Sequence, residues 1–500
     1  MTMTQTNHHS LLNYEAIMRL RLKKSYDQTM QNSTPLVSAQ HEHVSESLHQ
    51  NLIPPSSSIS LDEIIDQCLE GFGLPQFVQT LLLSLLLVFE SQQTFISVYT
   101  DAEPTWHCSK TTSIACSSIS DICNLSKSEW DWDGPSDKTI VSEWSLECAS
   151  SVLTGLPSSC FFIGSLFGGV ALATLGDSSL GRKKWRGQVA IIAFCFFSLG
   201  LISIPPMAYI NRDSSWKILY VWTSIPAILC CIVIYPFAIE SPRWLLMHGY
   251  EAEAVAVLKR LSSSSVNLDS LNRCLSNISP KEEVSTNVDL YSFLKDLFQR
   301  KWALRRLLTL MGLAFGIGMV YYGLLLGVGN LDFNVYLSLT FNGLLDIPAY
   351  IVTSILIERW NRRSSILTFS IISGITSGIC GVIGDGQEAA QVVLELASFF
   401  SVCVAFNVLL ICATELFPTC VRNSTTSMVR QAINFGAVFS PLLISAGRKN
   451  EFLSFGVFGL VVFCCGFFVL VLPETKGVAL SGTFDEQESK ENVIIIMRAS

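Results

Sequence analysis

Residues 307–328 read LLTLMGLAFGIGMVYYGLLLGV and contain no charged side chain. A bilayer core about 30 Å thick requires roughly 20 apolar residues for one helical crossing, so this segment is long enough to span a membrane. Because no water is available inside the hydrocarbon to satisfy backbone amides, a run of this length must be a helix. We predict ten such spans, at residues 77–98, 151–175, 189–210, 219–239, 307–328, 335–357, 366–383, 391–412, 428–446 and 452–472.

The composition agrees with a membrane protein and argues against several other classes. Charged residues make up 15% of the 500-residue chain, and the mean hydropathy is +0.42; soluble proteins carry about 25% charged residues. The formal net charge of -8 leaves no basic surplus for a phosphate backbone, so nucleic acid is not an expected partner. The sequence has no Walker loop, nucleophile elbow or Cys/His metal spacing. We therefore expect neither an enzyme nor a cofactor or metal site.

The spans divide the chain into five parts. We predict a disordered cytosolic tail at 1–59, a first transmembrane half at 60–240, a central cytosolic loop at 241–306, a second half at 307–472 and a cytosolic tail at 473–500. An amphipathic helix is expected to begin at Ser60, which has capping-box spacing to Glu63. Lys and Arg are concentrated in the short loops on the side of the N-terminal tail, so the positive-inside rule predicts that both termini are cytosolic.

The long loop at 100–149 lies on the opposite, extracytosolic side. It contains Cys108, Cys116, Cys123 and Cys148, together with the glycosylation sequence Asn124-Leu125-Ser126. In an oxidising compartment these residues predict two disulfides and a glycan at Asn124. Four cysteines allow three pairings, and the sequence does not choose among them.

The two halves have unequal numbers of spans. The first half has four and the second has six, whereas transporters are commonly built from two halves with equal numbers. The chain therefore has the organisation of six spans plus six with one hairpin missing from the first half.

Four loop motifs resemble the signatures of the major facilitator superfamily. They are GDSSLGRKK at 176–184, ESPRWLL at 240–246, ELFPT at 415–419 followed by Arg422 and Asn423, and PETKG at 473–477. The cysteine-bearing loop, WRGQ at 185–188 and Pro205 resemble the plant organic cation/carnitine branch. The resemblance implies an all-α integral membrane bundle that moves organic cations, such as carnitine or related quaternary amines, by alternating access. It also implies a small organic cation and membrane lipid as partners, coupling to a proton or sodium gradient, and a plasma or vacuolar membrane location.

The chain departs from the family pattern at one place. In the family the Gly-Arg-Lys-Lys segment opens the third span and Trp-Arg-Gly follows the fourth, yet here Trp185 follows Lys184 directly. The resemblance thus implies about ten spans in place of twelve, without the third and fourth. Two alternatives stay open: a non-transporting or regulatory isoform, and a carrier of sugars or organic anions.

The loop motifs also supply candidate gating residues, which are Gly176, Asp177, Gly181, Arg182, Lys183, Glu240, Arg243, Glu415, Arg422 and Glu474. Glu240 with Arg243, and Glu415 with Arg422, have the spacing of ion pairs that close one gate and break in the other state. Exposed pairs contribute at most about 1 kcal/mol each, so only several together would bias the equilibrium. The simpler interpretation is that these motifs only set the orientation of the spans in the membrane.

Polar and ionisable residues inside the spans are costly and are therefore candidates for the substrate site. The candidates are Glu90, Gln93, Asp346, Tyr322 and Asn434. Glu395 and Arg430 lie near the ends of their runs, where we expect them to snorkel and serve a structural role. Tyrosines 321, 322 and 350 are placed for cation-π contact or for packing. Asn434 lies seven residues before Pro441, where the resemblance implies Asp in animal cation carriers and Arg in anion or carnitine carriers. An amide there selects no charge.

Overall fold

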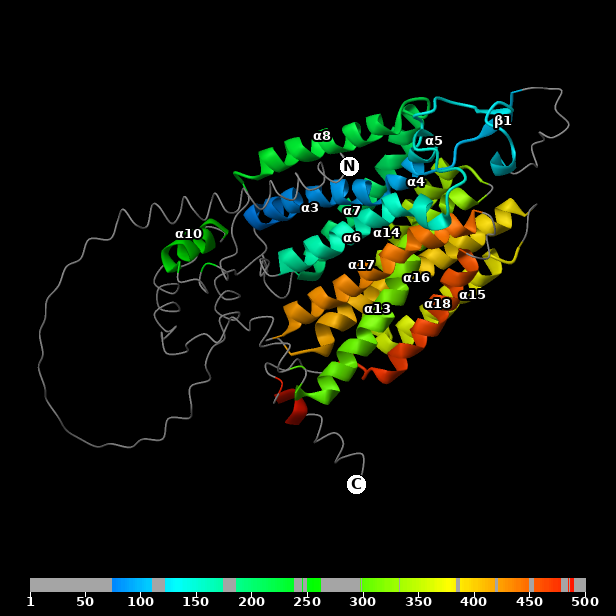
Figure 1. Cartoon of the computed structure of the whole chain (residues 1–500). Coiled ribbons are helices and arrows are strands. Elements are labelled where there is room, and N and C mark those ends of the chain that lie inside the picture. Colours follow the sequence, from blue (N-terminus) through cyan, green and yellow to red (C-terminus); the bar gives the residue numbers. More distant parts are fainter. Residues whose placement is uncertain are drawn as a thin grey trace, which may run out of the picture. The chain divides into compact units, whose positions relative to one another are not determined.

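The computed structural model describes residues 74–109, 122–173, 186–237, 245, 250–261, 297, 299–331, 333–383, 387–418, 421–448, 454–477, 484 and 486–489. Helices occupy all ten segments that the sequence predicts as spans (Figure 1). Their bounds are α3 Leu74–Phe95, α6 Ser151–Ala173, α7 Arg186–Ile210, α8 Trp216–Ile234, α13 Lys301–Gly327, α14 Val335–Arg359, α15 Arg362–Cys380, α16 Glu388–Leu416, α17 Arg422–Gly447 and α18 Phe455–Gly466, the last continued by the 3-10 helix η5 at Phe467–Val471.

Seven of these helices are long and apolar enough to cross a membrane by length and composition alone. The exceptions within the described residues are α15 and α17, which are richer in serine and other polar side chains, and α18, which is shorter. Short helices lie outside the ten: α4 at Ser97–Thr100 follows α3, α5 at Ile140–Glu143 lies in the long loop, and α10 at Glu251–Leu261 lies in the central loop. The N-terminal tail and the amphipathic helix expected from Ser60 fall outside the described residues.

The packing of the helices reveals an internal repeat. In the first half α3 packs against α7 and α8, and in the second half α13 packs against α17 and α18. Across the halves, α6 packs against α17 while α7 packs against α14. Exchanging α3, α6, α7 and α8 for α13, α14, α17 and α18 reproduces every one of these pairs, as expected for two structural repeats related by a pseudo-two-fold axis.

Equivalent glycines support the same assignment. A Cβ added at Gly200 of α7 would lie 2.3 Å from the carbonyl oxygen of Val88, and one added at Gly436 of α17 would lie 2.2 Å from that of Phe315. Both glycines thus let two backbones approach closely, as small residues do in membrane bundles. Each is followed five positions later by a proline, Pro205 or Pro441, inside its helix. The third helix of the first half is therefore the counterpart of the fifth helix of the second half.

Two helices of the second half have no counterpart among the described residues. These are α15 and α16, which pack against each other and against α13, α14 and α18. Only residues 174–185 separate α6 from α7, which is too few for two spans. The first half is correspondingly open, because only 17% of the apolar window of α8 is buried, the lowest share among the seven apolar helices.

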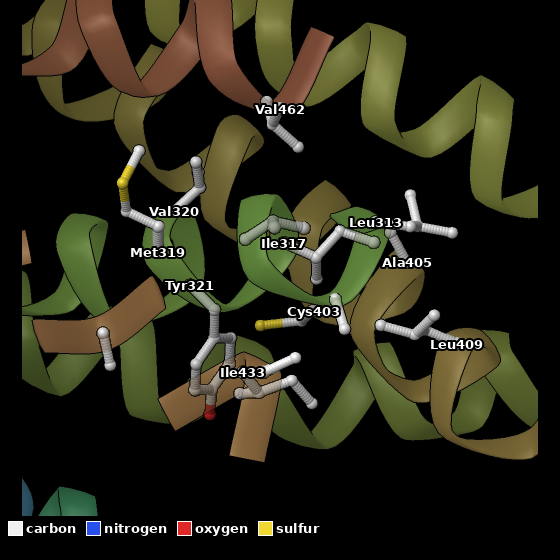
Figure 2. Close-up of a cluster of buried hydrophobic side chains, with 14 of the residues drawn as sticks. Leu313, Ile317, Met319, Val320, Tyr321, Cys403, Ala405, Leu409, Ile433 and Val462 are labelled. Atoms are coloured by element: carbon white, nitrogen blue, oxygen red, sulfur yellow. The ribbon is translucent and has the colours of Figure 1, made fainter. Parts of the chain in front are cut away.

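The second half has the larger hydrophobic core. Buried side chains of α13 and α16, including Leu313, Ile317, Tyr321, Cys403 and Leu409, interdigitate along its length (Figure 2). The core reaches the first half through Phe95 and Phe162, which are 0% and 2% exposed. The two halves thus share one packed interface.

The long loop forms a small folded unit. Strand β1 (Trp106–Cys108) pairs antiparallel with β2 (Trp130–Trp132), and a disulfide joins Cys123 to Cys148. Cys108 is also disulfide-bonded, to a partner outside the described residues. The Glu143 carboxylate accepts hydrogen bonds from Lys217 Nζ at 2.5 Å and Trp216 Nε1 at 2.6 Å, which ties the loop to α8. These two donors hold the pKa of Glu143 below its usual value.

We predict that Cys123 and Cys148 resist a membrane-impermeant maleimide in the non-reduced protein and react fully after mild reduction. The reason is that both sulfur atoms are consumed by one disulfide. Mass spectrometry of the labelled peptides provides the measurement, and the reduced sample is the positive control. Labelling of either cysteine before reduction would contradict the pairing. The same peptides report whether Asn124, which is exposed at the end of its short helix, carries a glycan.

Candidate functional site

An accessible charged site lies where the two halves meet. Glu90 of α3, Tyr322 of α13 and Arg430 of α17 are close enough to interact electrostatically. The side chains of Glu90 and Arg430 are exposed although both residues lie within helices assigned to the membrane. Because charged groups in spans usually face a bundle interior or a water-filled cavity rather than lipid tails, this trio is the candidate for an interior site. Its interaction with Glu90 and Tyr322 makes Arg430 a further candidate, beside the structural role expected from its position near a run end.

Aromatic rings surround Tyr322. Its ring centroid lies 6.0 Å from that of Phe95 in a stacked arrangement and 5.2 Å from that of Phe162 in an edge-on one. Tyr321 contributes a further ring at 5.2 Å. These rings come from α3, α6 and α13. Because Phe95, Phe162 and Tyr321 are buried, the half-buried Tyr322, which interacts with Glu90, is the ring of this group whose face a ligand can reach. A quaternary ammonium group is attracted to such faces.

The other two candidates occupy different positions. Gln93 Nε2 donates to Thr223 Oγ1 at 2.8 Å, so this side chain joins α3 to α8. Asn434 is half-buried and lies one helical turn beyond Arg430, on the same face of α17. The structure thus gives Gln93 a packing role and leaves Asn434 beside the accessible site.

Asp346 belongs to a second, buried group. It is 1% exposed, accepts a hydrogen bond from Ser198 Oγ at 3.2 Å, and lies 3.2 Å from the Cys403 sulfur. Glu395 is 0% exposed and accepts a hydrogen bond from Asn342 Nδ2 at 3.2 Å. The expectation that Glu395 snorkels is wrong, because its side chain is fully buried and its helix α16 packs against α13, α14, α15 and α17.

The halves are closed together at the end that carries the long loop. Thr154 of α6 hydrogen-bonds Ser445 of α17, and Ser159 Oγ donates to the carbonyl of Val438 at 2.9 Å. Arg448 Nη2 donates to the carbonyl of Asp101 at 2.6 Å. This end carries the Cys123–Cys148 disulfide, which fits the prediction that the long loop lies on the extracytosolic side.

At the opposite end, three motifs of the second half converge. Arg362 contacts both oxygens of Glu415, at 3.2 Å through Nε and 3.1 Å through Nη2. The Glu474 carboxylate accepts from the backbone amides of Arg362 and Arg363, at the start of α15. Glu415 therefore pairs with Arg362 and not with Arg422, the partner that the spacing favoured. In the sequence, the segment ERWNRR at 358–363, which contains Arg362, is the signal that could have located this cluster.

The other candidate gating residues cannot be placed. Gly176, Asp177, Gly181, Arg182, Lys183, Glu240 and Arg243 all lie outside the described residues. The gating role of the 176–184 motif and the pairing of Glu240 with Arg243 remain predictions.

Comparison with known proteins identifies the family. A profile described as "Sugar (and other) transporter" matches residues 197–483. The Arabidopsis thaliana organic cation/carnitine transporter 3 is 43% identical over 501 residues, covering 89% of this chain and 96% of its own. The chain belongs to the organic cation/carnitine transporter family. It is thus a multi-pass membrane carrier of the major facilitator superfamily and not an enzyme.

The chain is also similar to more distant proteins. The rat solute carrier family 22 member 3 is 29% identical over 308 residues, covering 61% of this chain and 54% of its own. Among solved structures, the inward-open xylose transporter XylE from E. coli is 14% identical with a TM-score of 0.48, covering 87% of this chain and 91% of its own.

The alignment with the Arabidopsis relative also has a gap. It runs over 501 residues, yet 89% of a 500-residue chain is only about 445, so about 55 residues of the relative lie opposite gaps in this chain. Two spans of roughly 20 residues with their connections account for such a length. This agrees with the finding that the described residues of the first half include no counterparts to α15 and α16.

Proposed function

We propose that this protein binds a small quaternary amine that also carries a carboxylate, as carnitine does, in the site formed by Glu90, Tyr322 and Arg430, and that its fold serves secondary transport by alternating access. The observation that supports this proposal is the accessible pair of opposite charges beside the ring of Tyr322. The names of the relatives, which include both organic cation and carnitine, agree with this substrate class.

The charges in the site favour a zwitterion over a simple cation. Glu90 and the π faces attract the ammonium group, while Arg430 attracts a carboxylate. A substrate without a carboxylate leaves Arg430 to compete for Glu90, which weakens the attraction for the cation. We therefore expect carnitine to bind more tightly than tetraethylammonium.

The missing hairpin favours a second candidate function. In the second half, α16 packs against α13 and α14 and seals that side of the interior. The first half has no such helix among its described residues, so this chain would transport poorly or act as a regulatory form that still binds substrate. We propose the plasma or vacuolar membrane as its location, and a proton or sodium gradient as the energy source of any transport.

We predict that two variants separate the roles of the charges. In purified protein in lipid nanodiscs, Glu90→Gln should weaken binding of both carnitine and tetraethylammonium by about tenfold, equivalent to roughly 1.4 kcal/mol. Arg430→Gln should weaken carnitine binding by a similar factor and leave tetraethylammonium binding equal or tighter. Calorimetry or scintillation proximity provides the measurement, and neither needs transport.

The matched control is Glu358→Gln, which neutralises an exposed carboxylate at the far end of α14 and should change neither affinity. Unchanged binding of both ligands by Glu90→Gln would contradict the proposed site. An equal loss of both ligands in Arg430→Gln would contradict the preference for a zwitterion.

A further inference from the structure

We infer that Asp346 and Glu395 form a proton-binding site inside the second half, and that Ser198 connects this site to the first half. This inference rests on the proposed function and deepens it, because it names the coupling ion and the residues that hold it. The site is separate from the Glu90 site, since neither carboxyl is accessible.

A polar stripe runs along one face of α14. Ser338, Asn342 and Asp346 follow one another at intervals of four residues, and their exposed fractions are 0%, 0% and 1%. This spacing places them on one helical face, toward α16. From α16, Glu395 contacts Asn342 and Cys403 contacts Asp346. Cys403 interacts electrostatically with both carboxyls, so the two acids belong to one buried cluster.

The cluster has no compensating positive charge among the described residues. The groups that face Asp346 are the hydroxyls of Ser198, Tyr321 and Tyr350 and the thiol of Cys403, with Cys195 beside Tyr350. The group that faces Glu395 is the Asn342 amide. An ionised carboxylate buried without a cation is very costly, and a bound proton removes that cost.

The hydrogen bonds around Glu395 are also incomplete. Its Oε2 accepts from Asn342 Nδ2, and that same amide nitrogen donates to the carbonyl of Ser338. Glu395 Oε1, Asn342 Oδ1 and Ser338 Oγ are buried without a partner in the described structure. A proton on Glu395 turns one unsatisfied acceptor into a donor beside another acceptor. The arrangement therefore fits a carboxylic acid better than a carboxylate.

The contact with Ser198 links the site to alternation. Ser198 lies on α7 of the first half, and it donates to Asp346 on α14 of the second half. Phe194, one turn earlier on α7, stacks on Tyr350 with a centroid distance of 5.1 Å. When the halves rock, α7 and α14 separate along this seam, and Asp346 exchanges a protein hydroxyl for water. The affinity of Asp346 for a proton then differs between the two states, which is the requirement for coupling.

Infrared spectroscopy of the ligand-free protein tests the inference. We expect a C=O stretching band of protonated carboxylic acid at neutral pH in the full chain in lipid nanodiscs. Asp346→Asn and Glu395→Gln should each remove one component of the band, and the double variant should remove both. Glu388→Gln, an exposed carboxylate at the start of α16, should leave the band unchanged. Size-exclusion profiles and thermal unfolding curves show that each variant is folded.

Two outcomes would overturn the inference. One is a band that both amide variants leave intact. The other is a band that disappears on addition of sodium chloride at constant pH and ionic strength, which would identify a sodium site. Because the measurement uses no substrate, its result does not depend on whether the carnitine site is correct. Failure of the Glu90 and Arg430 variants would leave the infrared result untouched.

Discussion

Insertion of the third and fourth spans of an Arabidopsis relative between Lys184 and Trp185 is expected to raise carnitine uptake by about tenfold or more over the unmodified chain. A tenfold gain corresponds to only about 1.4 kcal/mol. The expected cost of the gap is larger if lipid enters the interior through it, because a charged side chain such as Glu90 costs at least about 2.5 kcal/mol when it meets lipid. Uptake of labelled carnitine into cells or proteoliposomes, normalised to the amount of protein in the membrane, provides the measurement.

The control is an insertion of equal length that carries an unrelated two-span hairpin. It preserves the orientation of every later span but cannot supply the faces that pack on α3, α6 and α8. We expect it to restore no uptake. Equal uptake by the unmodified and the restored chains would show that four helices are enough for the first half. Genomic sequence across the junction would show whether an exon is skipped there.

Most of the helices could be predicted from the sequence because the membrane leaves few alternatives. The starts of α6 at Ser151 and α14 at Val335 coincide with the predicted starts of their spans. Apolar length and the need to satisfy backbone amides decide these positions locally. The other helices differ from their predicted spans by a few residues at either end, where polar residues such as Arg422 and Asn423 continue a helix into the interface.

The partners of the polar side chains could not be predicted in the same way. Asp346 and Glu90 look alike in the sequence, since each is an acid within an apolar run. Their difference arises from neighbours distant in sequence: Asp346 meets Ser198 and Cys403, whereas Glu90 faces Arg430. Spacing gives the face of a helix but not the helix that covers it.

One signal in the sequence did contain tertiary information. Gly200 with Pro205 and Gly436 with Pro441 have the same spacing, and both glycines lie at close helix contacts. This repeat alone would have aligned the third span of the first half with the fifth span of the second. It would have located the missing hairpin without reference to any relative.

A disulfide between cysteines introduced at Thr154 and Ser445 should abolish uptake by the hairpin-restored carrier. The two hydroxyls are hydrogen-bonded across the closed extracytosolic end, so cysteines at these positions are within reach of each other. Oxidation would lock α6 to α17, and the state open to the outside could no longer form. We expect loss of more than about nine-tenths of the uptake, and its return after reduction. Such a loss corresponds to an increase of about 1.4 kcal/mol or more in the activation free energy of transport.

The single variants Thr154→Cys and Ser445→Cys are the matched controls, and each should retain uptake under the same oxidant because neither can form the cross-link. Cleavage within the central loop, followed by electrophoresis with and without reductant, measures how much of the double variant is cross-linked. Full cross-linking with uptake unchanged would mean that α6 and α17 do not separate during the cycle. The seam between α7 and α14, where Ser198 meets Asp346, would then have to move alone.

Since α6 with α17 and α7 with α14 are equivalent pairs of the repeat, rocking of the halves opens one end of the interior as it closes the other. A disulfide between α6 and α17 should therefore also hold Asp346 against Ser198. The buried acids would then stay in one protonation state. The infrared band of the oxidised protein should accordingly not change when substrate is added.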